Sequence, residues 1–179
     1  MSDMNTLLMG PRGCGKSSVG QRLADLLQQP FVELDDRVLE TFAEPSVDEI
    51  WSVHGEPAWR TAEVRQLNRI LEKDGQVVAL GGGTPMIDAA QQRLQDERRA
   101  RRAWLIYLAC PVSDLRRRLE RNLGDRPSLT GADSLDELEE VLTAREPTYR
   151  RLADVIVQAA RRTPDEIAAQ LAKEIDETR

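Results

Sequence analysis

A short segment near the start of the chain could bind a phosphate group. The sequence Gly10-Pro11-Arg12-Gly13-Cys14-Gly15-Lys16-Ser17 satisfies the pattern G-x-x-x-x-G-K-[ST] and lies between a predicted strand and a predicted helix, as that motif requires. The glycines let successive backbone N–H groups converge on phosphate oxygens, and the positive end of the helix adds to their field. We expect Lys16 to bridge the β and γ phosphates of a nucleotide and the Ser17 hydroxyl to ligate Mg²⁺.

Carboxylates gather at the end of the second apolar run, Phe31 to Leu34. If this run is a strand, Glu33 and Asp35 share one face, because side chains alternate along a strand. Ligands of open α/β sheets bind beyond the carboxyl ends of the strands, so the pair is predicted to lie beside the phosphate loop. Glu33 is then placed to hold water on Mg²⁺, and Asp35 to receive a hydroxyl group. The alternative is that Asp35 and Asp36 only cap the helix that follows.

The elements that must position these residues alternate along the chain between short apolar runs and longer amphipathic stretches. This alternation predicts an α/β fold, a mostly parallel sheet covered by helices, in one domain over residues 1–179. The predicted strands, all expected to be buried, are Thr6–Met9, Phe31–Leu34, Val77–Leu80, Trp104–Leu108 and Val155–Val157. The predicted helices are Ser17–Leu27, Pro57–Leu71, Val112–Arg121, Leu135–Arg145 and one from Pro164 to about Glu174. The segment of about 122–133 contains Gly124, Pro127 and Gly131 and is predicted to be a mobile loop.

The composition excludes several classes of protein. Lys and Arg total 25 against 31 Asp and Glu, for a net charge of -6, so no general positive field attracts nucleic acid or an anionic membrane. Two cysteines and one histidine cannot build a disulfide framework or a Cys/His zinc site, which favours a reduced, cytoplasmic setting. No apolar run approaches the roughly 20 residues that span a bilayer, and the first residues lack the features of a signal peptide.

Further motifs follow the phosphate loop in a fixed order. They are Glu33-Leu34-Asp35, Gly55-Glu56-Pro57-Ala58-Trp59-Arg60, Gly81-Gly82-Gly83, Arg126-Pro127 inside the predicted loop, and Arg145-Glu146-Pro147-Thr148-Tyr149-Arg150. The phosphate loop alone is generic, whereas the patterns G-E-x-x-[FW]-R, G-G-G and R-x-P-x-Y-R in this order are specific. From about residue 4 to residue 165, the chain resembles the shikimate kinase family.

The resemblance implies a three-layer α/β/α fold with a five-stranded parallel sheet, similar to that of nucleoside monophosphate kinases, and a lid at about 122–133. It implies transfer of a phosphoryl group from ATP to the 3-hydroxyl of shikimate, in aromatic amino acid biosynthesis. The implied cofactor is Mg²⁺, and the implied partners are only these small molecules, bound by a cytoplasmic monomer.

Particular residues take roles from the same resemblance. Those implied to be catalytic are Lys16, Asp35 and Arg126. Those implied to contact shikimate are Asp35, Arg60, Gly81, Gly82, Gly83 and Arg145. Those implied to contact ATP are Arg12, Gly13, Cys14, Gly15, Lys16, Ser17, Ser18, Arg121, Arg126 and Arg162, and the metal falls to Ser17 and, through water, Glu33. An arginine fork matches a planar carboxylate in two hydrogen bonds, which suits Arg60 and Arg145 to the carboxylate of shikimate. By themselves, Arg60 could be a solvated helix charge and the triple glycine a flexible turn.

The chain departs from the family pattern at several points. The family pattern is F-x-D-x-D, but this chain has Glu33 in place of the first Asp. A longer side chain therefore stands on the metal side. Counting back from Arg60 without gaps reaches Asp36 as the substrate acid, whereas the strand pattern selects Asp35 and requires one extra residue within Phe42 to Ser46. We favour Asp35, because surface turns tolerate insertions. The lid is short, since four residues separate Arg121 from Arg126.

Two other functions fit part of the sequence. One is a kinase of the same fold with another acceptor, such as gluconate or a nucleoside monophosphate. A nucleotide acceptor requires a base-binding pocket and more arginines that face phosphate, whereas two arginines and Asp35 suit a small hydroxy acid. The other is a nucleotide-gated switch or a regulatory relative without activity. The presence of residues for both halves of a transfer site argues against it, because a binding module need not retain both halves.

Overall fold

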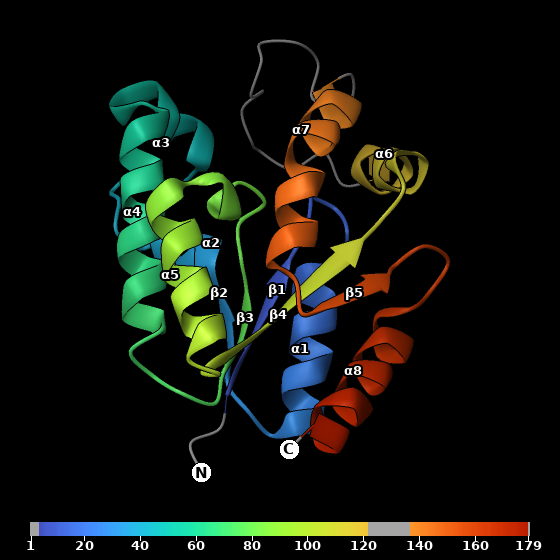
Figure 1. The fold of residues 1–179 in the computed structure, drawn as a ribbon. Helices are drawn as coiled ribbons and strands as arrows, with labels where there is room; N and C mark the ends of the chain where they lie inside the picture. Colours follow the sequence, from blue (N-terminus) through green and yellow to red (C-terminus); the bar gives the residue numbers. More distant parts are fainter. Residues whose placement is uncertain (1–3, 122–136, 179) are drawn as a thin grey trace.

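The computed structural model describes residues 4–121 and 137–178 of the chain (Figure 1). The strands are β1 (Asn5–Met9), β2 (Phe31–Glu33), β3 (Val77–Ala79), β4 (Ala103–Ala109) and β5 (Val155–Gln158). The helices are α1 (Lys16–Leu27), α2 (Leu34–Leu39), α3 (Val47–His54), α4 (Glu56–Ile70), α5 (Asp88–Arg99), α6 (Val112–Arg121), α7 (Glu137–Leu152) and α8 (Pro164–Thr178), with a short 3-10 helix η1 (Thr84–Met86). Within these ranges, no helix is long and apolar enough to cross a membrane. The predicted lid of about 122–133 and the predicted helix start at Leu135 lie outside the described residues.

The five strands form one sheet in the order β2-β3-β1-β4-β5, and every pair of neighbours is parallel. β1 lies at the centre, where Leu7 is opposite Val78 on one side and Leu105 on the other. All five strands therefore end at the same edge of the sheet. The predicted α/β fold with a five-stranded parallel sheet is confirmed.

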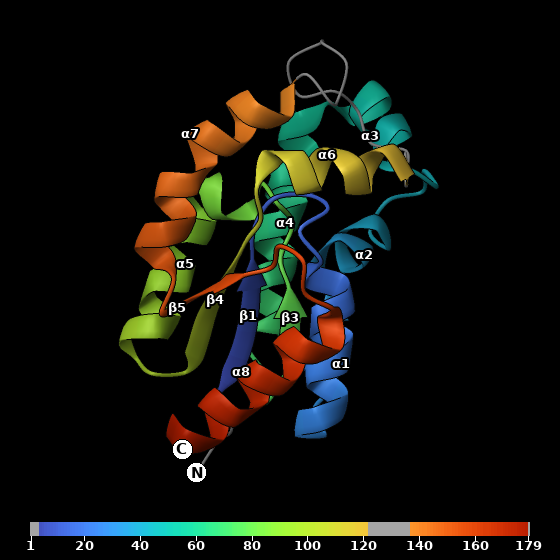
Figure 2. The same ribbon diagram turned by 90° about the vertical axis from the view of Figure 1, so that its right-hand side faces the viewer.

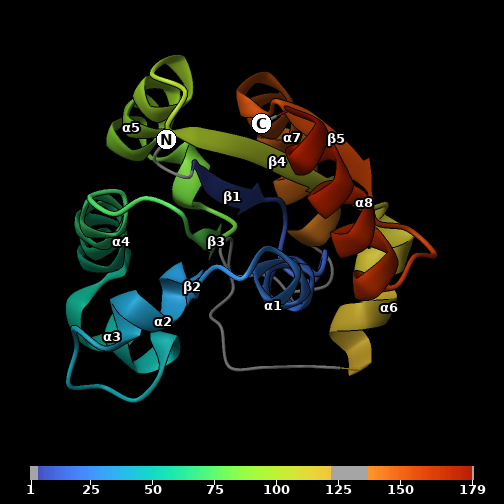
Figure 3. The same ribbon diagram turned by 90° about the horizontal axis from the view of Figure 1, so that it is seen from below.

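Helices cover both faces of the sheet (Figure 3). Because side chains alternate along β1, Leu7 enters one apolar cluster, with residues of α4, α5 and the end of α7, and Leu8 enters the other, with residues of α1, α6 and α8. Figure 2 shows α1 and α8 side by side over their face of the sheet. The result is the expected three-layer α/β/α arrangement.

The carboxyl ends of the strands lie at the end of the molecule where α3, α6 and the first turns of α7 stand (Figure 1). The start of β1 and the end of α8 lie at the opposite end. Loops that leave the carboxyl ends of the strands therefore converge in one region, which is where an open parallel sheet binds its ligands.

The helices α3 and α5 were not among the predicted helices, and three other elements differ from the prediction in their bounds or burial. β2 ends at Glu33, and the chain turns at once into α2 at Leu34. α7 continues through Pro147 to Leu152, although a proline inside a helix removes a hydrogen bond, because the buried Tyr149 and Leu152 hold its last turns against the core. β5 is an edge strand on which Ile156 is 40% exposed, so it is only partly buried.

Candidate active site

The phosphate loop joins the carboxyl end of β1 to the first turn of α1. Gly13 and Gly15 have φ angles of 80° and 105°. Residues with a side chain rarely adopt these left-handed conformations, so the turn requires both glycines. The unbonded N–H groups of the first turn of α1 open toward the loop. A cavity of about 550 Å³ lies over it. Its lining includes every predicted nucleotide contact of the loop: Arg12, Gly13, Cys14, Gly15, Lys16, Ser17 and Ser18.

The side chain of Lys16 is buried and folds back onto its own loop. Its Nζ donates to the carbonyl oxygen of Gly10 at 2.9 Å and to that of Pro11 at 3.0 Å. Burial removes water from the ammonium group, and these two carbonyls provide hydrogen bonds in its place. A phosphate in the cavity would offer the same ammonium a charged acceptor, which forms a stronger hydrogen bond than a neutral carbonyl does.

Ser17 and Glu33 form the oxygen-rich part of this cavity. The Ser17 hydroxyl and the Glu33 carboxylate interact, and both residues line the cavity. Burial raises the pKa of Glu33, although the Ser17 hydroxyl and the charge of Lys16 partly oppose that rise. A hydroxyl and a carboxylate are oxygen ligands of the kind that Mg²⁺ prefers, so these two residues fit that ion. The described residues contain no group of three or more His, Cys, Asp or Glu that could hold a metal, so phosphate oxygens and water would supply its other ligands.

Asp35 lies in the first turn of α2 and not on a strand. The prediction that Glu33 and Asp35 share the face of one strand is therefore wrong, because β2 has already ended. The helix nevertheless turns Asp35 toward the site: Asp35 lines the nucleotide cavity, whereas Asp36 is exposed and does not. Leu34 and Val38 are fully buried, and they fix the rotation of this short helix. The choice of Asp35 as the substrate acid stays a prediction, now on helical grounds.

A second cavity, of about 100 Å³, adjoins the first. Arg12, Asp35 and Gly82 line both cavities, so the two share a wall. The remaining lining of the smaller cavity is Val47, Trp51, Trp59, Arg60, Glu63, Gly81, Gly83 and Arg145. The fold thus brings together all the residues that the resemblance implied for the substrate, although they come from four separate parts of the chain.

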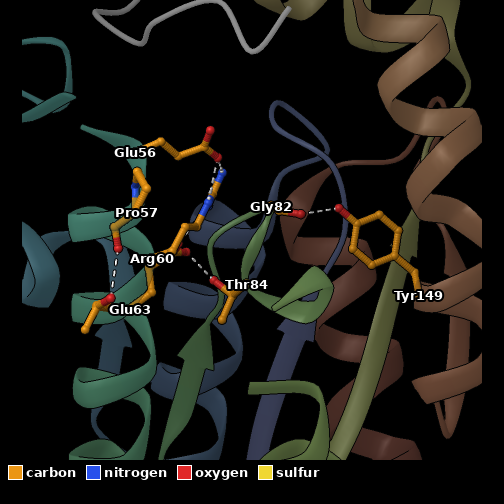
Figure 4. Close-up of polar contacts among 8 residues, drawn as sticks. Glu56, Pro57, Arg60, Glu63, Gly82, Thr84 and Tyr149 are labelled. Atoms are coloured by element: carbon orange, nitrogen blue, oxygen red, sulfur yellow. Dashed lines mark hydrogen bonds and ion pairs between the residues drawn. The ribbon is translucent and has the colours of Figure 1, made fainter. Parts of the chain in front are cut away.

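Arg60 is held in this second cavity by two carboxylates of its own helix (Figure 4). Its Nη1 donates to Glu63 at 2.7 Å, and its Nε and Nη2 donate to the same oxygen of Glu56 at 2.9 and 2.8 Å. Burial alone would lower the pKa of Arg60, but the attraction of Glu63 and Glu56 outweighs it and raises that pKa. With a side chain 22% exposed and bonded on both edges, Arg60 is not a solvated helix charge.

Glu63 was missed as a site residue by the sequence analysis. Its side chain is 1% exposed, and it accepts a hydrogen bond from the Thr84 hydroxyl at 2.6 Å as well as the one from Arg60. Burial raises the pKa of Glu63, and Arg60 and Thr84 only partly oppose that effect. The sequence did contain a signal that could have identified Glu63. It follows Arg60 by three residues, which places the two on one face of a helix.

The glycine run allows polar side chains to approach the backbone closely. A Cβ atom on Gly81 would stand 2.6 Å from Asp35 Oδ1 and 2.7 Å from Glu63 Oε1, and one on Gly83 would stand 2.6 Å from Arg60 Nη1. Real Cβ contacts are not that short, so any side chain at these two positions would displace the site. The run is therefore a site of close approach and not merely a flexible turn.

Arg118 is a second residue that the sequence analysis missed. It lines the nucleotide cavity and donates to the carbonyl oxygens of Gly13, Cys14 and Ala159 at 3.3, 3.0 and 2.9 Å. The buried Leu115 precedes it by three residues, so the helical period places Arg118 toward the core side of α6. Arg121 was the residue of this helix predicted to contact ATP. The Arg121 side chain and Arg126 lie outside the described residues, and both assignments stay predictions.

The predicted nucleotide contact Arg162 and two tryptophans complete the walls of the two cavities. Arg162 lines the nucleotide cavity, and its Nη2 donates to the carbonyl oxygen of Glu166 at 3.1 Å. On the other side, Trp51 and Trp59 supply an apolar wall to the smaller cavity, and the Arg60 guanidinium lies 5.7 Å from the centre of the Trp51 ring. The smaller cavity therefore offers one apolar wall, three arginines and two carboxylates.

A nucleotide-sized cavity that shares a wall with a smaller, arginine-lined one is suited to bringing a terminal phosphate up to a small acceptor. On a parallel sheet with this phosphate loop, that arrangement defines a P-loop kinase of small molecules. The family model described as shikimate kinase matches residues 12–176. The chain therefore belongs to the shikimate kinase family.

Individual relatives agree with this assignment. A shikimate kinase of Stenotrophomonas maltophilia (strain R551-3) is 36% identical over 167 residues, which cover 93% of this chain and 89% of the relative. The solved structure of shikimate kinase from Acinetobacter baumannii in complex with shikimate superimposes with a TM-score of 0.88 and 27% identity, over 99% of this chain and 95% of that one. A gluconokinase from Sinorhizobium meliloti 1021 has a TM-score of 0.54 and 20% identity, over 98% of this chain and 97% of that one, which is a likeness of fold alone.

Proposed function

We propose that the protein transfers a phosphoryl group from ATP to the 3-hydroxyl of shikimate, giving shikimate 3-phosphate for aromatic amino acid biosynthesis. The observation that carries the proposal is the position of Asp35 in the wall shared by the two cavities. A carboxylate there can meet a hydroxyl group on one side and a transferring phosphoryl group on the other. The relative from Acinetobacter baumannii was solved with shikimate, which supports this acceptor.

Shikimate carries one carboxylate and three hydroxyls, and the smaller cavity offers complementary groups. Arg60 and Arg145 would bind the carboxylate, since a guanidinium group matches it with two parallel hydrogen bonds. Arg60 can do so without losing its buried partner: Glu63 holds Nη1, and the exposed Glu56 would release Nε and Nη2. Gly82 would allow the ring of the substrate to approach the backbone, and Trp51 and Trp59 would cover its apolar side.

The nucleotide would bind in the larger cavity. The loop N–H groups would receive its phosphates, and Lys16 would exchange the carbonyls of Gly10 and Pro11 for β and γ phosphate oxygens. Ser17 and, through water, Glu33 would hold Mg²⁺, which supplies positive charge against the phosphate oxygens. Arg12, Arg118 and Arg162 line the same cavity and add positive charge to its walls.

Phosphoryl transfer passes through a loose transition state, so the protein mainly positions the reactants and neutralises charge. Asp35 would orient the 3-hydroxyl and accept its proton as the new P–O bond forms and the bond to the leaving diphosphate breaks. Lys16 would stabilise the charge on the transferring group. Arg126 and the lid of about 122–133 keep the roles that the resemblance implies, closing over ATP and excluding water as a competing acceptor. We also propose a cytoplasmic monomer, in which the two buried cysteines stay reduced.

The direct test is an assay of the purified protein with ATP and Mg²⁺ against shikimate, quinate and gluconate. The proposal predicts rapid formation of ADP and shikimate 3-phosphate with shikimate and much slower turnover with the other two acids. Faster turnover with gluconate would support the alternative acceptor. ATP binding without transfer to any of the three acids would favour a nucleotide-gated switch.

A further inference from the structure

The glycine run Gly81–Gly83 has no side chains with which to anchor itself, yet it forms one wall of the substrate cavity. Each of its carbonyl oxygens is nevertheless bonded. The N–H of Thr84 donates to Gly81 at 3.1 Å, and the N–H of Met86 donates to Gly83 at 2.9 Å, both within the turn that contains η1. The carbonyl of Gly82 is held differently, by the hydroxyl of Tyr149 on α7 (Figure 4).

Packing of its ring holds Tyr149 in place independently of its hydroxyl. Its side chain is fully buried, and its ring stacks on that of Tyr107 in β4, with ring centres 5.1 Å apart. Burial raises the pKa of Tyr149, so the phenol stays protonated and can donate to Gly82. The hydroxyl is thus presented to the glycine run from a rigid support.

The same hydroxyl also contacts a predicted substrate arginine. Arg145 precedes Tyr149 by four residues on α7, which places both on one face of the helix, and its Nη1 lies 3.8 Å from where a Cβ atom on Gly82 would stand. Its positive charge also acts on the Tyr149 hydroxyl, where it partly opposes the rise in the pKa of that phenol. Since a phenol can donate one hydrogen bond and accept another, Tyr149 can donate to Gly82 and still accept from the guanidinium group of Arg145. Arg145 and Gly82 both line the smaller cavity.

We propose that Tyr149 is a positioning residue for the acceptor, whose hydroxyl sets the placement of Arg145 relative to Gly82. This inference rests on the proposed function, because it assigns the two linked groups to the binding of shikimate. Tyr149 does not touch the substrate itself. It makes the glycine run and the arginine of α7 a single rigid wall, so that the carboxylate and the ring of the acceptor are received in one fixed arrangement.

The test is Tyr149→Phe, which keeps the ring and removes only the hydroxyl. We expect the KM for shikimate to rise at least about five-fold, the cost of losing a buried hydrogen bond being of that order. The KM for ATP should change less than about two-fold, because the hydrogen bond that Tyr149 donates goes to Gly82 and not to the phosphate loop. Tyr107→Phe is the matched control, since it removes the hydroxyl from the other ring of the same stack, and it should leave the KM for shikimate unchanged.

A double variant separates positioning from general packing. If Tyr149 acts through Arg145, Tyr149→Phe should add little to the KM for shikimate once Arg145 is alanine. An unchanged KM for shikimate in Tyr149→Phe, or equal rises for shikimate and ATP, would overturn the inference. The same rise in Tyr107→Phe would also overturn it. If the wild-type protein failed to phosphorylate shikimate, the proposed function itself would be at fault, and the wild-type assay shows this before any variant is compared.

Discussion

The guanidinium group of Arg60 lies directly against the backbone of Gly83, at a place where a Cβ atom would stand 2.6 Å from Nη1. Glu63 and Glu56 hold the guanidinium group in this position through hydrogen bonds. A substrate arginine is therefore held both by a close backbone that has no side chain and by two carboxylates of its own helix. Its direction is set before any acceptor arrives.

We predict that Gly83→Ala acts on the acceptor and not on the nucleotide. The added methyl group must displace Arg60, so the KM for shikimate should rise about 10-fold or more, as expected for loss of a charge-assisted contact, with little change for ATP. Steady-state kinetics with each substrate varied in turn would measure both values. Combined with Arg60→Ala, the glycine substitution should have little further effect; independent, additive losses would contradict this explanation.

The two neighbouring aspartates of α2 should differ sharply. Asp35→Asn keeps the shape of the side chain but removes the charge that orients and deprotonates the hydroxyl, so kcat should fall at least about 100-fold. Asp36 is exposed and lines neither cavity, and Asn is about as good as Asp near the start of a helix, so Asp36→Asn should cost at most a few fold. The measurement is kcat at saturating ATP and shikimate. A crippled Asp36→Asn beside an active Asp35→Asn would reverse the assignment.

Lys16→Ala should abolish transfer while the protein stays folded. The ammonium group bonds only loop atoms in the described structure, the carbonyls of Gly10 and Pro11 and, at 3.9 Å, the sulfur of Cys14. Its loss removes charge from the phosphate site and leaves the apolar clusters intact. Circular dichroism should match the wild type, whereas product formation should be undetectable. Turnover near the wild-type rate would show that the phosphate loop has been misassigned.

Glu33→Gln should raise the Mg²⁺ concentration needed for half-maximal activity about 10-fold or more, the usual cost of losing a group that orients the shell of a metal. The exposed Glu40, at the end of α2, provides the control: Glu40→Gln should leave the Mg²⁺ requirement unchanged. A titration of activity with Mg²⁺ at fixed ATP compares the three proteins. Equal requirements in wild type and Glu33→Gln would remove Glu33 from the metal site.

Glu63 should make stability depend on pH in a definite direction. Burial raises its pKa in the folded protein above the unfolded value, so its contribution to stability is fully present below the unfolded pKa and is lost as the pH rises through the folded pKa. Any stability advantage of the wild type over Glu63→Gln should therefore be largest near pH 4.5 and smaller at pH 8. Melting temperatures of both proteins across this range would show it. An advantage that grows with pH would mean that Arg60 and Thr84 outweigh burial.

The sequence predicted the sheet and its motifs well because those depend on local chemistry. The loop of Gly10 to Ser17 contains its own signal, and each apolar run identifies a strand within a few residues. The failure at Asp35 has a different cause: after Glu33, the burial of Leu34 and Val38 favours a helix, and six residues are too few for a helical period to be recognised. The predicted helix ended at Arg145, whereas α7 continues through Pro147, because packing of Tyr149 against Tyr107 outweighs a local helix breaker.

Contacts made across the molecule could not be predicted. Nothing near Arg118 in the sequence indicates that it reaches Gly13 and Ala159, since those contacts exist only once α6 has packed beside the loop. The helix α3 was also not predicted, although the sequence contained a signal for its start. Ser46 caps it by accepting a hydrogen bond from the N–H of Glu49, and that pair was visible in the sequence. Local signals thus identified the motifs, and tertiary packing decided which residues meet.

The central position of β1 also constrains how the chain can fold. β1 precedes the other strands of the described structure, yet both of its partners, β3 and β4, come much later, and both pairings are parallel. During synthesis one edge of β1 stays open until residue 77 has emerged, and the other stays open until residue 103 has emerged. An open strand edge is a template for pairing with other chains. The phosphate loop, which leaves the end of this strand, therefore lacks the support of the complete sheet until β4 has emerged, and shorter nascent chains should depend on chaperones rather than bind nucleotide.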